Sequence, residues 1–316
     1  MKFRNSIIGL AVLMAAAGKE ASSGGSSKKG DPAAPAGKPG AELKVQTETA
    51  NAVAVNNDEM DFAADAGKGT EGVDKDSQAI PFLVVLQSNS PAVVDETVPG
   101  AKPGLLMNSV TGELFEKLVV VPVSFQRRFV EWAPRKLGGG YKGEHMPAAV
   151  EGGEYGYKAH DSVSSYFVAP EGEKPLGREA AKDKHNALKD TRSHFILAVK
   201  PDGTFFPALF PLASTQIKKS KKWVSMIVGV QLRDGAGNLY NPASFSHMYT
   251  IGTVKESNAE GNWFGITVDA AGAVKSKTIY EAAKELHGQV AAGKVNVVQP
   301  DANVGGADGE GGGEGF

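Results

Sequence analysis

Two apolar runs on either side of a tight turn constrain the fold of this chain more than any other feature. Residues 194–210 read HFILAVK, PDG and TFFPALF, with β-branched and aromatic side chains in both runs. Pro-Asp-Gly is a favoured turn sequence, so the pattern predicts an antiparallel β-hairpin. The core is therefore expected to be built from antiparallel sheet.

Further stretches carry the same strand signals. The first core segment is AIPFLVVLQ at 79–87. The stretch LVVVPVSFQRRFVEW at 118–132 predicts a strand that is bulged at Pro122, because proline has no N–H to give to a ladder. The stretches 245–257 and 262–268 predict two more strands, joined by the turn NAEGN.

Two helices are expected among these strands. STQIKKSKKWVSMIVGV at 214–230 begins as a helix with Ser214 or Thr215 as its N-cap. The second helix is predicted at 276–293, where Gly293 suits the C-cap and one face is apolar, with Ile279, Ala283, Leu286 and Val290.

The order of these elements favours a particular mainly β fold. Several strands, one helix and two more strands match a five-stranded OB-type barrel, whose helix lies between the third and fourth strands. The core domain, taken as 77–298, is longer than a minimal barrel, so an OB-like barrel with insertions is predicted. A general antiparallel β sandwich is the alternative.

The two ends of the chain differ in composition from the core. A leader at 1–76 is predicted to be disordered, since residues 19–76 are rich in Gly, Ala, Ser, Pro and charge. Within it, residues 7–17 form an apolar, signal-like segment after Lys2 and Arg4. It is a signal peptide, a short apolar helix or an upstream start to a cytosolic reading frame. The glycine-rich acidic tail at 299–316 is predicted to be disordered as well.

Charge is strongly segregated, although the formal net charge is only -2. Between Thr191 and Arg233 there are seven basic residues and one acid, whereas 299–316 carries four acids and no base. Such blocks indicate a surface that binds a polyanion and a tail that competes for it. The chain has no cysteine, which excludes disulfides, thiolate zinc sites and a thiol nucleophile.

No motif points to catalysis. GGGYKG at 138–143 formally fits G-x-G-x-x-G, but Pro134 separates it from the preceding strand and no helix follows, so no dinucleotide cofactor is expected. The histidines lack ligand spacing and no carboxylate pair stands out, so neither a metal nor an enzyme is predicted. Residues 138–163 are expected to form long loops with a short ribbon. The glycine-rich stretch is predicted to be a flexible loop that presents Arg135, Lys136, Tyr141 and Lys142 to a nucleic-acid backbone.

Two stretches combine basic with aromatic residues. On the first helix, like charges at Lys218 and Lys222 repel each other, and a phosphate backbone would turn that repulsion into attraction. The alternative is a solvated basic face over a Trp223 that is buried in the core. The candidate DNA-binding residues of this helix are Lys218, Lys219, Lys221, Lys222 and Trp223.

The second stretch is RRFVEWAPR at 127–135, where strand alternation places Arg127 and Arg128 on opposite faces. Cations beside a stacking aromatic are what sequence-neutral single-strand binding requires, so Arg127, Arg128 and Trp132 are candidates. The alternative is that Phe129 and Trp132 are core residues.

Together these features resemble the phage single-stranded DNA-binding proteins, in which an OB-type core precedes an acidic tail that ends in an aromatic residue. The stretches 79–91, 127–140 and 214–223 also look like those of a group of phage early-region proteins. The resemblance implies that the tail competes with DNA and docks onto replication proteins such as a polymerase or helicase. The corresponding tail residues here, diluted with glycine, are Asp301, Asp308, Glu310, Glu314 and Phe316.

The resemblance also implies a role and a location. The expected function is sequence-neutral binding of single-stranded DNA in phage replication or recombination, in the cytoplasm of the infected host. A homo-oligomer is left open. The rival hypothesis is an exported envelope-associated or virion structural protein, placed in the periplasm or envelope if residues 1–17 act as a signal peptide.

Overall fold

The computed structural model describes residues 62, 64–73, 80–259 and 261–295. The chain divides into two compact units, Met1–Asp65 and Ala66–Phe316, and all helices and strands of the described residues belong to the second. The predicted tail lies outside the described residues, as does most of the predicted leader, including its apolar segment 7–17.

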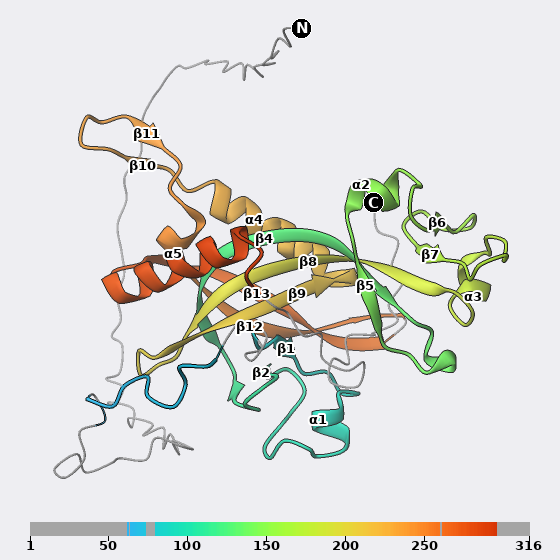
Figure 1. Ribbon diagram of the computed structural model, residues 1–316, viewed down its shortest axis with the longest axis horizontal. Helices are drawn as coiled ribbons and strands as arrows, with labels where there is room; N and C mark the ends of the chain where they lie inside the picture. The colour runs from blue at the N-terminus through green and yellow to red at the C-terminus, as the bar shows by residue number, and fades with distance from the viewer. Residues whose placement is uncertain (1–61, 63, 74–79, 260, 296–316) are drawn as a thin grey trace, which may run out of the picture. The chain divides into compact units, whose positions relative to one another are not determined.

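Figure 1 shows a mainly β unit with several antiparallel sheets and few helices. Along the described chain the elements are β1 (Leu83–Val85), α1 (Pro91–Val94), β2 (Leu106–Asn108), β3 (Leu114–Phe115), β4 (Leu118–Trp132), η1 (Arg135–Leu137), β5 (Tyr141–His145), α2 (Pro147–Glu151), β6 (Tyr157–Lys158), β7 (Tyr166–Val168), α3 (Arg178–Ala181), β8 (Asn186–Val199), β9 (Phe205–Ala213), η2 (Ser214–Gln216), α4 (Ile217–Val228), β10 (Leu232–Arg233), β11 (Leu239–Tyr240), η3 (Ser244–Ser246), β12 (His247–Asn258), β13 (Gly261–Ala273) and α5 (Lys277–Ala291).

The long antiparallel pair of β4 and β8 is the spine of the largest sheet. One half of the pair is flanked by β12 on the β4 side and by β9 on the β8 side, and β13 extends the sheet beyond β12. The other half is flanked by β5 on the β4 side and by β7 and β6 on the β8 side. The predicted hairpin is confirmed as β8 and β9, and the last two predicted strands as β12 and β13.

A bulge in β4 sets which side chains face which layer. The register with β8 shifts between Pro122 and Ser124, as the sequence predicts. Val120 and Ile196 lie in one apolar cluster with Trp223 of α4, whereas Val121 and Leu197 lie in another with Leu286 of α5. The two long helices therefore cover opposite faces of the sheet.

A closed five-stranded barrel is not formed by the described residues. No backbone ladder joins β9 to β13. Residues 81–87 lie between β9 and β13 instead. On the β9 side, the Leu209 N–H donates to the Pro81 carbonyl (2.9 Å). The Gln87 side chain then bonds both the N–H and the carbonyl of Phe264 in β13 (2.8 and 2.9 Å). A side-chain bond from the Ile266 N–H to Gln216 Oε1 (3.0 Å) completes the bridge.

The helix predictions are partly confirmed. In α5, Ser276 Oγ caps the helix by accepting from the Ile279 N–H (3.4 Å), and Gly293 follows it with a left-handed φ of 64°. The predicted N-cap of α4 is wrong: the 3-10 turn η2 precedes the helix, and no side chain caps α4. The one-turn helices α1, α2 and α3 were not predicted. Within the described residues, no helix is long and apolar enough to cross a bilayer.

Candidate functional site

Helix α4 presents a row of lysines on its outer face. Lys218, Lys221 and Lys222 are exposed. The inner face is fixed to the sheet by Ser220 and Trp223, both almost completely buried. The exposed lysines thus sit on a helix whose orientation is set by its core contacts.

Lys219 differs from its three neighbours. Its Nζ lies 2.5 Å from Glu256 Oε1 of β12, and Trp263 Nε1 donates to the other oxygen of the same carboxylate (2.9 Å). The positive charge of Lys219 is therefore already balanced within the sheet.

Trp223 is a core residue, so its predicted stacking on a DNA base is wrong. Its side chain is 0% exposed, and its ring stacks on that of His194 with centroids 4.4 Å apart. His194 in turn bonds Ser220 Oγ through Nε2 (2.8 Å). The helical repeat places Trp223 on the apolar face of α4, although it directly follows the lysines in sequence. This is the alternative named above, a solvated basic face over a buried Trp223.

The β4 arginines lie on opposite faces, as strand alternation predicts. Arg127 lies over the ring of the buried Phe129, 5.5 Å from its centroid, on one face. Arg128 is partly exposed, and its Nη1 donates to the Arg127 carbonyl (2.9 Å). The core alternative is therefore right for Phe129.

Trp132 and Tyr141 form an aromatic pair at the far end of the sheet. They are register partners of β4 and β5, and their rings meet edge to face with centroids 6.1 Å apart. Trp132 is half-buried and Tyr141 is 40% exposed. Partial burial, with a smaller effect of the nearby Glu144 charge, raises the pKa of the Tyr141 hydroxyl. This pair keeps the exposed ring surface that stacking on a base needs.

The loop between β4 and β5 is a glycine turn and carries no dinucleotide fold. Gly138, Gly139 and Gly140 all have left-handed φ angles, of 94°, 65° and 103°, which only glycine adopts readily in succession. A strand follows it where a cofactor-binding helix would be needed. The exposed basic residues here are Arg135 and Lys136 of η1 and Lys142 of β5, and Lys136 Nζ lies 2.5 Å from Asp183 Oδ2.

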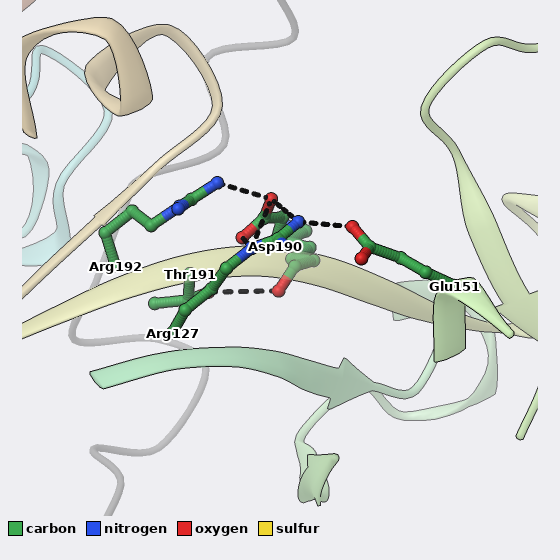
Figure 2. A network of polar contacts seen from close by, with 6 residues as sticks. Arg127, Glu151, Asp190, Thr191 and Arg192 are labelled. Carbon is green, nitrogen blue, oxygen red and sulfur yellow. Dashed lines mark hydrogen bonds and ion pairs between the residues drawn. The ribbon is translucent and has the colours of Figure 1, made fainter. Parts of the chain in front are cut away.

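Arg127 belongs to an ion network that the sequence interpretation missed (Figure 2). Its Nε and Nη2 bond the Asp190 carboxylate of β8, and Nη2 also contacts Glu151 Oε1 of α2 (2.5 Å). Arg192 Nη2 bonds the same carboxylate from the other side (3.0 Å). The hydrogen bond to Asp190 is the main reason that the pKa of Arg127 is raised. Asp190 and Arg192 are two residues apart on one strand, so the sequence indicates that they share a face. It does not indicate the contact with Glu151, which comes from a different element.

A second missed cluster surrounds Glu131. This carboxylate is 5% exposed and is bonded by Tyr155 Oη, Asn186 Nδ2 and His145 Nε2 at 2.6, 2.6 and 2.7 Å. Burial acts to raise the pKa of Glu131, but the three bonds together hold it below its ordinary value. The cluster ties β4, β5 and the segment before β6 to β8.

The structure brings the predicted residues together only in part. The described residues contain no group of three or more His, Asp or Glu side chains that could hold a metal ion. The tail residues Asp301, Asp308, Glu310, Glu314 and Phe316 lie outside the described residues. The remaining candidates form two sets, the exposed lysines of α4 and the region of β4, η1 and β5.

Comparison with known proteins gives one match. No curated protein and no solved structure matches the chain. A family model does match, over residues 47–296, and its description names a phage protein without mention of DNA. Because the match spans most of the chain, including every described helix and strand, the protein belongs to the Pam3 phage gp34-like protein family.

Proposed function

We propose that this phage protein binds single-stranded DNA without sequence preference, in replication or recombination within the infected cell. The observation that carries the proposal is the outer face of α4. Its three exposed lysines repel one another, since spacings of three and four residues place them side by side. A phosphate backbone relieves that repulsion and releases counterions, which favours binding of any sequence.

The strand order supports an OB-related assignment of the unit. The spatial order β12, β4, β8, β9 is 4-1-2-3, which is a Greek key, and α4 lies between the third and fourth of these strands. OB folds are five-stranded, partly open Greek-key barrels that bind oligonucleotides. We infer an opened version, in which residues 81–87 fill the gap between β9 and β13 and residues 133–185 enlarge the first loop.

Stacking is assigned to Trp132 and Tyr141, and phosphate contacts to the basic residues that flank them. The rings offer exposed π surface at the start of the enlarged loop, where OB folds contact their ligands. The flanking residues are Arg128, Arg135, Lys136 and Lys142. Trp223 has no part in this assignment, because it is buried, and neither has Lys219, because its ion pair with Glu256 is largely shielded from solvent. The ion pair of Lys136 with Asp183 is solvent-exposed, so Lys136 remains accessible to a phosphate.

The test is fluorescence anisotropy with a labelled oligothymidylate at several salt concentrations. Wild-type protein is expected to bind at low salt, and log K to fall against log salt by about 0.7 per phosphate contact. The triple variant K218Q/K221Q/K222Q is expected to bind more weakly and to have a slope that is shallower by about two.

The matched control is K275Q/K277Q/K284Q. It also removes three positive charges, but from exposed lysines at or beside α5, on the opposite face of the sheet. If the two triple variants lose equal affinity for the oligothymidylate, the effect is one of net charge and the α4 face is not the binding site. If the wild-type protein does not bind at the lowest salt, the proposed function is overturned.

A further inference from the structure

Arg127 is held by two carboxylates in different ways (Figure 2). Asp190 receives three bonds from it, from Nε at 3.1 and 3.2 Å and from Nη2 at 2.7 Å. Glu151 makes a single contact, from Oε1 to Nη2 at 2.5 Å. The Asp190 side chain is 21% exposed and the Glu151 side chain 44%. Of the two, Glu151 is the more weakly attached and the more solvated.

The backbones that carry these carboxylates also differ. Asp190 lies within the β4–β8 ladder opposite Phe129, and Arg192 bonds it as well. Glu151 is the last residue of the one-turn helix α2. The neighbouring Val150 is buried among Phe129 and Leu188, so α2 stays in place whichever way the Glu151 side chain turns.

A phosphate can take the place of Glu151 without disturbing Asp190. Half-exposed ion pairs contribute little to stability, because solvent screens them and the side chains lose freedom. Arginine bonds phosphate oxygens through strong, charge-assisted hydrogen bonds. Asp190 meanwhile keeps the guanidinium oriented through Nε and Nη2. A phosphate oxygen that replaces Glu151 bonds the same Nη2, which has a second N–H to donate.

We propose that Glu151 is an exchangeable carboxylate that masks Arg127 and gives way to a phosphate of single-stranded DNA. This inference rests on the proposed DNA binding and adds a regulatory element to it. The protein then carries a built-in competitor within its folded unit, and the exchange at this one guanidinium lowers its apparent DNA affinity.

The experiment compares E151Q with E154Q by anisotropy with the labelled oligothymidylate. Glu154 is exposed and three residues further along, and within the described residues it has no ion pair with Arg127. Each variant removes one negative charge from the same segment. E151Q is expected to bind about two- to five-fold more tightly than E154Q, as loss of one screened ion pair allows.

A double-mutant cycle tests whether the gain acts through Arg127. In an R127Q background the E151Q substitution is expected to leave the affinity unchanged, because no guanidinium remains to be unmasked. Circular dichroism and the thermal midpoint check that each variant is folded. Equal affinities of E151Q and E154Q, or a gain that persists with R127Q, would overturn the mask.

The outcomes separate this inference from the function on which it rests. Wild-type protein that binds no oligothymidylate at the lowest salt overturns the proposed function. Wild-type protein that binds, with E151Q no tighter than E154Q, overturns the mask alone and leaves the network a structural brace between α2, β4 and β8.

Discussion

His194 is a titratable side chain enclosed by rings. It lies between Phe125 and Trp223, with ring centroids 5.0 and 4.4 Å away, and its only described hydrogen-bond partner is Ser220. Burial, together with the positive charge of Arg192, lowers the pKa of His194 from 6.5 to about 3. The folded protein therefore holds this imidazole neutral, whereas the unfolded chain protonates it below pH 6.5.

This difference predicts a pH dependence of stability. Between pH 6.5 and about 3 the unfolded chain binds the extra proton, so the free energy of unfolding falls as the pH is lowered. Urea unfolding from pH 7.5 to pH 4 measures it. H194Q is expected to be less stable at neutral pH, and its deficit relative to wild type to shrink towards pH 4. The exposed-residue control H160Q should follow the wild-type curve; a constant gap for H194Q would contradict a neutral buried imidazole.

Helix α4 depends on Trp223 as its anchor to the sheet. The indole packs on His194 and meets Tyr249 edge to face, with centroids 6.1 Å apart. W223A is expected to lower the free energy of unfolding by about 3–5 kcal/mol, the usual loss for a buried large aromatic residue. Urea denaturation measures this loss.

The matched substitution is W132A at the half-buried end of β4. It is expected to cost less stability and to weaken oligothymidylate binding by about 1–3 kcal/mol, the range for a base-stacking ring. If folded W223A binds the oligothymidylate more weakly and W132A binds it as wild type does, then Trp223 and not Trp132 is the base-stacking residue, and the prediction is wrong.

At this scale the sequence predicts some elements better than others. The β4 strand and its bulge were readable because Pro122 interrupts an otherwise continuous β-branched run. The first half of β8 was not, because Asp190 and Arg192 put charge on the face that is apolar further along the strand. Asp190 is bonded by Arg192 of the same strand and also by Arg127 of β4, and no local pattern reveals that second, cross-strand partner. The same holds for Gln87, whose bonds to β13 take the place of the expected barrel closure.

At the scale of the whole molecule, the sequence predicts that the acidic tail is a second competitor for DNA. Deleting residues 301–316 is expected to tighten binding of oligothymidylate, most clearly at low salt, where charges are least screened. Anisotropy titrations of full-length and tail-deleted protein at two salt concentrations measure the effect.

Deletion of Phe316 alone is the control, since it leaves all four tail acids in place. DNA affinity is then expected to stay the same, while a pull-down of the phage replication polymerase is lost if the terminal ring is the docking anchor. A tail deletion without effect on DNA affinity, together with an intact pull-down after Phe316 removal, would leave the tail without either role.

The pairing of β12 with β4 has a consequence for how the chain folds during synthesis. Tyr249 and Ile251 must return to Val120 and Leu118, from which they are separated by the β8–β9 hairpin and α4. Such distant contacts form late, because the entropy of closing the loop must be overcome first. On the ribosome, β4, β8 and β9 emerge with residues 118–120 of β4 still lacking their β12 partner and with the apolar cluster under α4 incomplete. Protease resistance of nascent chains is therefore expected to appear only after Val268 has left the exit tunnel, when the last strand can complete that cluster.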